Sequence, residues 1–133
     1  LLKHAILPFF AVVHAFTVFA VVTDRENMAQ TMQWPAQDQT LEAKHLWGAL
    51  GAAHVAMLVN ALAGIFHEGS HYRGIAILLE IILWGGDLLD AWAMDFPIDK
   101  LTVLTGIAAL GGIVHLNEPG LFTKDKTTKT KSK

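Results

Sequence analysis

The chain has 133 residues, of which 53% are hydrophobic and 17% charged, and its formal net charge is −2. Soluble domains carry about 25% charged residues, so this composition, with a mean hydropathy of +0.40, indicates a single-domain membrane protein. The chain contains no cysteine, which excludes a disulfide framework and a thiolate metal site. Apart from the C-terminal lysines, the basic residues form no surface that would bind nucleic acid.

The first apolar block runs from Ala5 to Val22 and contains no charged side chain. Pro8 lies near its start, where a missing backbone N–H is tolerated, and His14 lies mid-way along it. We expect a membrane-spanning helix over residues 5–22. No A-x-A-like cleavage site precedes the polar residues that follow, so a cleaved signal peptide is not expected.

The second apolar block, Leu46 to Phe66, follows a polar stretch and contains 21 uncharged residues. About 20 residues are needed to cross a 30 Å hydrocarbon core, so we expect a helix over 46–66. It places His54 and Asn60 within the membrane. Small residues recur at every fourth position and predict close packing against a neighbouring helix; they are Gly48, Ala52 and Ala56.

The third block, residues 74–94, holds three carboxylates, those of Glu80, Asp87 and Asp90. A charged side chain at the bilayer centre costs at least about 2.5 to 3.5 kcal/mol, so these acids are expected to face protein or a wet cavity. At 100° per residue, Glu80 and Asp87 share one stripe of the helix, with Trp84 between them and Asp90 about 60° to the side. We expect this helix to be the most central of the bundle.

The fourth block, Leu101 to Leu116, is uncharged, and we expect a helix over 101–117. Short connections between the second, third and fourth blocks favour antiparallel neighbours. The expected fold is therefore all-α, an antiparallel bundle of four transmembrane helices over residues 1–122. Residues 123–133 have no apolar periodicity and are expected to form a disordered basic tail.

Basic residues indicate how the bundle is oriented. If both termini are cytosolic, that side carries seven lysine and arginine residues and the other side carries three, as the positive-inside rule requires. The sequence KTKSK, Lys129 to Lys133, also resembles a dilysine retrieval signal. Such a signal would place the protein in the membrane of the endoplasmic reticulum.

Ionisable side chains on facing helices are the usual material for proton transfer within a membrane. Depth counted from the ends of the apolar blocks, at 1.5 Å per residue, places His54 opposite Asp87. The adjacent Gly85 and Gly86 leave room for a ligand or another helix. We therefore predict Asp87 as a general acid or base, His54 as its proton partner and Asp90 as the residue that orients them.

The same depth count places Asn60 opposite Glu80. We predict that four side chains anchor a substrate: Glu80, Asn60, Trp84 and His14. Alternatively, the acids of the third helix fix helix packing alone, by pairing with neighbours such as Arg73.

Three functions agree with these features. The first is a small membrane enzyme that uses Asp and His acid–base chemistry on a lipophilic substrate, such as a sterol, a terpenoid or a polyketide-like molecule. The second is a non-catalytic subunit or assembly factor of a membrane complex, whose polar stripe pairs with another chain or another copy. Neither needs a cofactor or a metal. The third is a b-type haem protein with two axial histidines among His14, His54 and His115.

Overall fold

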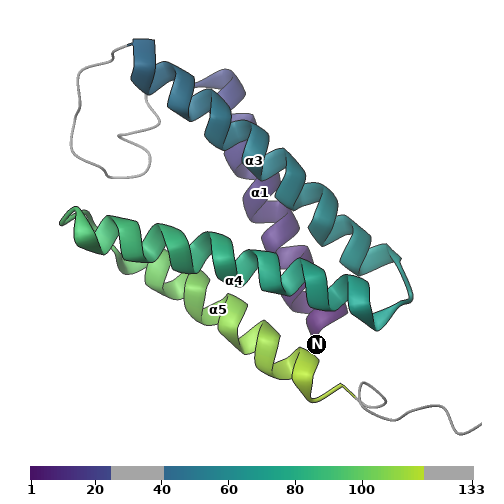
Figure 1. The fold of residues 1–133 in the computed structure, drawn as a ribbon. Helices are drawn as coiled ribbons and strands as arrows, with labels where there is room; N and C mark the ends of the chain where they lie inside the picture. The colour runs from purple at the N-terminus through teal and green to yellow at the C-terminus, as the bar shows by residue number, and fades with distance from the viewer. Residues whose placement is uncertain (25–40, 119–133) are drawn as a thin grey trace, which may run out of the picture.

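The computed structural model describes residues 1–24 and 41–118, and these residues are all-helical (Figure 1). A π-helical turn, Leu2–Ile6 (η1), leads into the first helix. The helices are α1 (Leu7–Thr23), α3 (Leu41–Phe66), α4 (Ser70–Ala93) and α5 (Asp99–Leu116). The four predicted helices are confirmed, whereas the predicted tail, 123–133, lies outside the described residues.

The helix ends differ from the predicted ends by at most five residues. The largest difference is the start of α3, which lies at Leu41 because Leu, Glu, Ala and Lys are all good helix formers. An apolar pattern marks the part of a helix that lies at membrane depth, not its first turn. Pro8 occupies the first turn of α1, where a missing N–H is tolerated, and the turn before it is π-helical.

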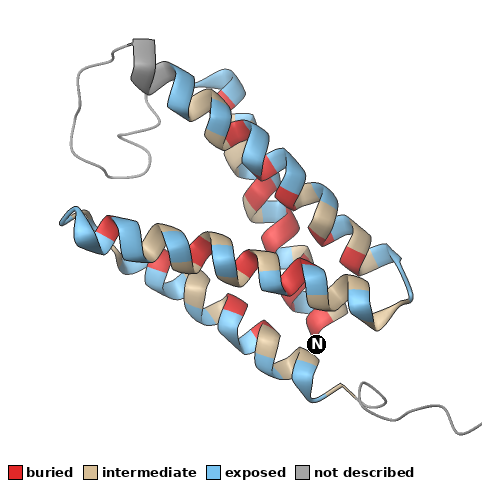
Figure 2. Cartoon of the chain, in the orientation of Figure 1, coloured by how far each residue is buried: buried red, intermediate tan, exposed pale blue. Residues whose placement is uncertain are grey.

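Three of the described helical segments are long and apolar enough to cross a membrane: Leu2–Thr23, His45–Phe66 and Asp99–Leu116. α4 has 24 residues, a length of about 36 Å, but it differs from the others in carrying four charged side chains. Large apolar side chains are exposed on the outer faces of the bundle (Figure 2), as expected for surfaces that meet lipid; examples are Phe16, Phe19, Val59 and Ile113.

Successive helices run in opposite directions and pack as two pairs, α1 with α3 and α4 with α5 (Figure 1). Three residues, 67–69, join α3 to α4, and these two helices also pack against each other. α4 contacts α1 as well, so it touches each of the other three helices. The two pairs lie closest near residues 67–69 and spread apart toward the C-terminal end of α4 (Figure 1).

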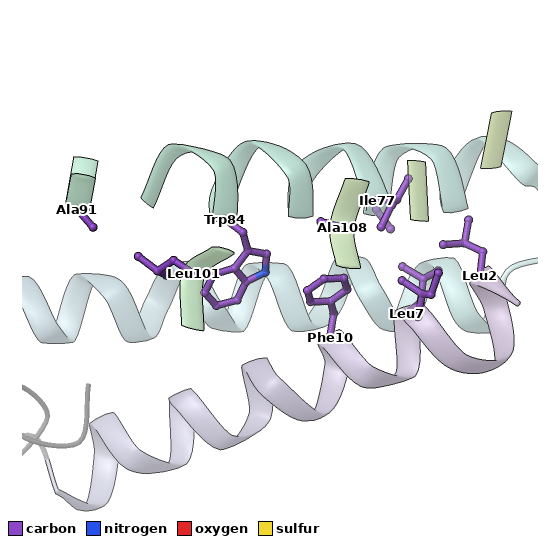
Figure 3. Packing of buried hydrophobic residues seen from close by; sticks show 10 residues of the cluster. Leu2, Leu7, Phe10, Ile77, Trp84, Ala91, Leu101 and Ala108 are labelled. Atoms are coloured by element: carbon purple, nitrogen blue, oxygen red, sulfur yellow. The ribbon is translucent and has the colours of Figure 1, made fainter. Parts of the chain in front are cut away.

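An apolar core lies between η1, α1, α4 and α5 (Figure 3). Phe10 of α1 and Trp84 of α4 meet in it, with ring centroids 6.5 Å apart. On α5, Ala108 is fully buried, and a Cβ added at Gly111 would collide with the side chain of Ile77. Small residues at these positions therefore let α4 and α5 approach each other.

The small residues at which α3 approaches its neighbours are not the predicted ones. Ala52 and Ala56 are exposed, whereas a Cβ added at Gly51 would lie 2.9 Å from Val21 and one at Gly64 would lie 2.8 Å from Leu7. Small residues occur on several faces of this helix, so their spacing alone does not identify the buried face. The buried face of α3 is the one that carries His54.

Candidate functional site

Three ionisable side chains from three helices form one hydrogen-bonded network. His14 of α1 lies between the other two: its Nδ1 is 2.7 Å from Nδ1 of His54 in α3, and its Nε2 is 2.9 and 3.0 Å from the two carboxylate oxygens of Glu80 in α4. The exposed fractions are 0%, 2% and 1% for His14, His54 and Glu80. We call these three residues the buried network.

Trp84 completes the surroundings of the carboxylate. It lies one helical turn beyond Glu80 on α4, and its indole N–H donates a hydrogen bond of 2.9 Å to Oε2. The same ring stacks on His14, with centroids 5.8 Å apart and planes inclined by 13°. Phe10 packs on the imidazole of His14. The carboxylate thus has hydrogen-bond partners from two helices, inside an otherwise apolar core.

Arg73 does not neutralise Glu80. Its guanidinium forms two hydrogen bonds to Glu118, from Nε at 3.2 Å and from Nη2 at 3.1 Å, and Nδ1 of His115 lies 3.6 Å from the same carboxylate. The alternative in which Arg73 pairs with the acids of its own helix is therefore wrong for Glu80. Glu80 has no Lys or Arg partner in the described residues, so only protons on the network can compensate its charge.

The predicted pair of His54 and Asp87 is not formed. His54 bonds to His14 instead, and Asp87 lies two helical turns beyond Glu80, about 10.5 Å along the axis. Asp87 is half-buried and Asp90 exposed, and the structure gives neither carboxylate a hydrogen bond or ion pair within residues 1–24 and 41–118. The predicted roles of these two acids therefore stay predictions.

Gly85, next to Gly86 and Asp87, is half-buried and Gly86 is exposed, and the room for a ligand or another helix that they predict stays a prediction. Apart from the chain neighbours and the backbone of α4 itself, a Cβ added at Gly85 or Gly86 would have no atom within 4 Å. Asn60, in contrast, does not meet Glu80 as predicted. Its side-chain amide donates to the carbonyl of Ala56, one turn earlier in the same helix, at 3.0 Å.

The short connection between α3 and α4 explains why His54 meets the network and not Asp87. His54 lies 12 residues before Phe66, the last residue of α3, and the residue 12 places after Ser70, the first of α4, is Ile82. That level falls between Glu80 and Trp84. Residues counted outward from the 67–69 connection give this pairing of levels. The predicted pairing was counted from the outer ends of the two apolar blocks, which assumes that both ends lie in one membrane plane.

The network does not fit the haem alternative. Axial ligands approach a haem iron from opposite faces of the macrocycle, and a metal between two imidazole nitrogens holds them roughly 4 Å apart, given bonds of about 2 Å as for zinc. His14 and His54 lie closer, with ring centroids 4.9 Å apart and Nδ1 atoms in direct hydrogen-bond contact. His115 lies beside Gly74 and Glu118 instead.

The arrangement is suited to holding and moving a proton, because a carboxyl group and two imidazoles follow one another at hydrogen-bond distance. Among the described residues, no group of three or more His, Cys, Asp or Glu side chains is placed to hold a metal ion. No protein-family model, curated protein or solved structure matches the chain.

Proposed function

We propose that the protein is a small integral membrane enzyme that carries out acid–base chemistry on a lipophilic substrate. The observation that supports this most is the continuous chain of Glu80, His14 and His54 inside an apolar bundle. Ionisable groups are costly to bury in a membrane and are usually functional there. One donor and one acceptor suffice to join two helices, whereas three ionisable groups in series supply both a proton donor and a proton acceptor.

The outer surface favours a substrate that arrives from the bilayer. Exposed apolar side chains cover the described helices, so a sterol, a terpenoid or a polyketide-like molecule would approach through lipid. Asp87 is half-buried beside the open positions Gly85 and Gly86. In this proposal Asp87 contacts the polar group of the substrate, and Asp90 lies one turn further along α4. Asp87 transfers one proton as a general acid or base, and the buried network supplies or removes the other.

The proposal is tested by comparing three matched preparations of membranes that contain the wild-type protein, Glu80→Gln or Glu68→Gln. Glu68 is an exposed glutamate in the connection between α3 and α4, so Glu68→Gln is the control for loss of a carboxylate. We expect organic extracts, analysed by mass spectrometry after incubation in D₂O, to contain a deuterium-labelled lipophilic product in the wild type and in Glu68→Gln. That product should be missing in Glu80→Gln. Identical extracts at equal amounts of inserted protein would contradict the proposal.

A second candidate is a non-catalytic subunit of a membrane complex, favoured by Asp87 and Asp90. Both carboxylates lack partners in the described residues, and a basic side chain of another chain would satisfy them. In this case Asp87→Asn would reduce the size of the particle extracted in mild detergent, measured by native electrophoresis. An unchanged particle would argue against the subunit.

We propose four membrane spans with cytosolic termini and residence in the endoplasmic reticulum. The orientation is supported by the distribution of basic residues, and the location by the pattern KTKSK, which lies outside the described residues. An Asn-x-Ser/Thr site engineered within residues 25–40 should be glycosylated, because that segment would be lumenal. An unmodified site in an inserted protein would reverse the orientation.

A further inference from the structure

We infer that the buried network exchanges its proton with the surroundings at Nε2 of His54, and that His54 does this by changing tautomer without becoming a cation. The inference rests on the network that the proposed function uses, but its test needs no substrate. It follows from one contact, the 2.7 Å hydrogen bond between the Nδ1 atoms of His14 and His54. Such a bond needs one proton between the two nitrogens, because one must donate and the other accept.

In the anionic form of the network, Glu80 is a carboxylate and both histidines are neutral. A carboxylate only accepts hydrogen bonds, so Nε2 of His14 carries the proton that it donates to Glu80. Nδ1 of His14 is then bare and accepts the N–H of His54 Nδ1. The remaining nitrogen of His54, Nε2, is therefore unprotonated.

In the neutral form the network holds one more proton. A positive charge on His54 would be separated from the carboxylate by the ring of His14, so the added proton is held closer to Glu80, where opposite charges attract more strongly. Glu80 is then protonated and donates to Nε2 of His14, or Glu80 stays ionised beside a His14 imidazolium. Nδ1 of His14 carries a proton in both cases and donates it to Nδ1 of His54. Because His54 now accepts at Nδ1, its own proton lies on Nε2 whichever way the charge is divided between His14 and Glu80.

Conversion between the two forms balances at every bond. A proton binds Nε2 of His54, and the His54 N–H bond at Nδ1 breaks as that proton passes to Nδ1 of His14. His14 then keeps protons on both nitrogens as an imidazolium, or it passes its Nε2 proton to the carboxylate of Glu80 and becomes neutral. One proton enters at His54 and one negative charge is cancelled at the other end of the chain.

Only the network itself is positioned to take part in this exchange. Between His4 and Asp24 of the first helix, His14 is the one ionisable residue, and between His45 and the end of α3 it is His54. On α5, residues 101–114 include no ionisable side chain. On α4 the neighbouring ionisable residues are Arg73, which is paired with Glu118, and Asp87, about 10.5 Å along the helix from Glu80.

The test is nitrogen NMR of the full chain, labelled with ¹⁵N in the seven histidines and held in lipid nanodiscs, with His54→Gln used to assign the His54 signals. As the pH falls, we expect Nε2 of His54 to change from an unprotonated to a protonated nitrogen while Nδ1 changes in the opposite direction. The inference is overturned if His54 keeps one tautomer at every pH at which the protein stays folded. Protonation of both nitrogens of His54 would overturn it equally.

Glu80→Gln gives a second, sharper expectation. Trp84 donates to Oε2 of Glu80, so the amide oxygen of glutamine occupies that position and its NH₂ group faces Nε2 of His14. His14 then accepts at Nε2 and donates from Nδ1, which fixes His54 with its proton on Nε2 at all pH values. A tautomer change that persists in Glu80→Gln contradicts the inference.

Glu68→Gln is the matched control and should titrate like the wild type, because Glu68 lies in the connection before α4. The outcome is separable from that of the proposed function. A tautomer change in a protein that yields no product supports the network and removes the enzyme. Turnover without a tautomer change supports the enzyme and contradicts the inference.

Discussion

Carboxylates and glycines have different surroundings in the two halves of the bundle. Near the 67–69 connection the helices converge, Glu80 has hydrogen-bond partners from two helices, and glycines such as Gly111 lie against side chains of neighbouring helices. In the half where α4 ends, Asp87 and Asp90 have no partner in the described residues, and Gly106 faces open space. The distance of a carboxylate on α4 from the connection therefore decides whether partners of the bundle enclose it or leave it available to another molecule.

The largest expected effect separates Glu80 from Asp87. Glu80→Ala leaves Nε2 of His14 and the indole N–H of Trp84 buried without a partner, and each unsatisfied group costs about 1 to 3 kcal/mol of unfolding free energy. Asp87→Ala should cost less than about 0.5 kcal/mol, because it breaks no contact. Denaturant unfolding in mixed micelles measures both. Equal losses would show that the two halves do not differ.

A smaller effect is expected from packing on α5. Gly111→Ala places a methyl group against Ile77, and overpacking of this kind costs about 1 to 3 kcal/mol. Gly106→Ala lies on the same helix with nothing nearby, so it should be neutral or stabilise by up to about 1 kcal/mol through helix propensity. The same unfolding measurement applies. Destabilisation by Gly106→Ala would mean that the open half is more tightly packed than the structure shows.

Trp84→Phe tests a single hydrogen bond of the network. The change keeps an aromatic ring in the core but removes the N–H that reaches Glu80, and we expect a loss of about 1 kcal/mol. Trp92→Phe is the matched control, since Trp92 is 71% exposed and should tolerate the change. A Trp84→Phe protein as stable as the wild type would show that the imidazole of His14 alone satisfies the carboxylate.

The smallest expected change in stability is that of Asp87→Asn. The amide keeps the shape of the side chain and cannot transfer a proton, so folding and insertion should be unchanged within about 0.5 kcal/mol. Product formation should nevertheless be lost if Asp87 contacts the substrate. Full activity in a correctly inserted Asp87→Asn protein would remove Asp87 from the proposed site.

Local patterns were enough to predict the helices, because hydrocarbon thickness sets the length of an apolar block. They were also enough to predict that Glu80 faces protein, because a carboxylate in lipid is costly. They did not identify its partners. The depth count placed His54 beside Asp87, although the three-residue connection sets a register about 7.5 Å different along the axis.

The sequence predicts that His14 lies between the levels of Asp87 and Glu80, but it does not predict that His14 bonds to both His54 and Glu80. No short connection joins α1 to α3, so no register can be counted between them. The contact of His14 with both His54 and Glu80 depends on how three helices tilt and rotate, and such geometry is set by packing across the bundle and not by sequence spacing. The sequence identifies the seven histidines and the acids as candidates. Which of them are hydrogen-bonded to one another, and in what order, is seen only in the structure.

The three-residue connection also has a consequence for how the protein enters a membrane. α4 carries four charged side chains, and on its own it would meet lipid with an unpartnered carboxylate at position 80. Residues 67–69 hold it beside α3, but the imidazole bonded to Glu80 belongs to His14 of α1, so α1 must also be adjacent when α4 leaves water. α4 is therefore expected to insert against α1 and α3 together, so that assembly of the bundle and membrane insertion of its most polar helix are one event.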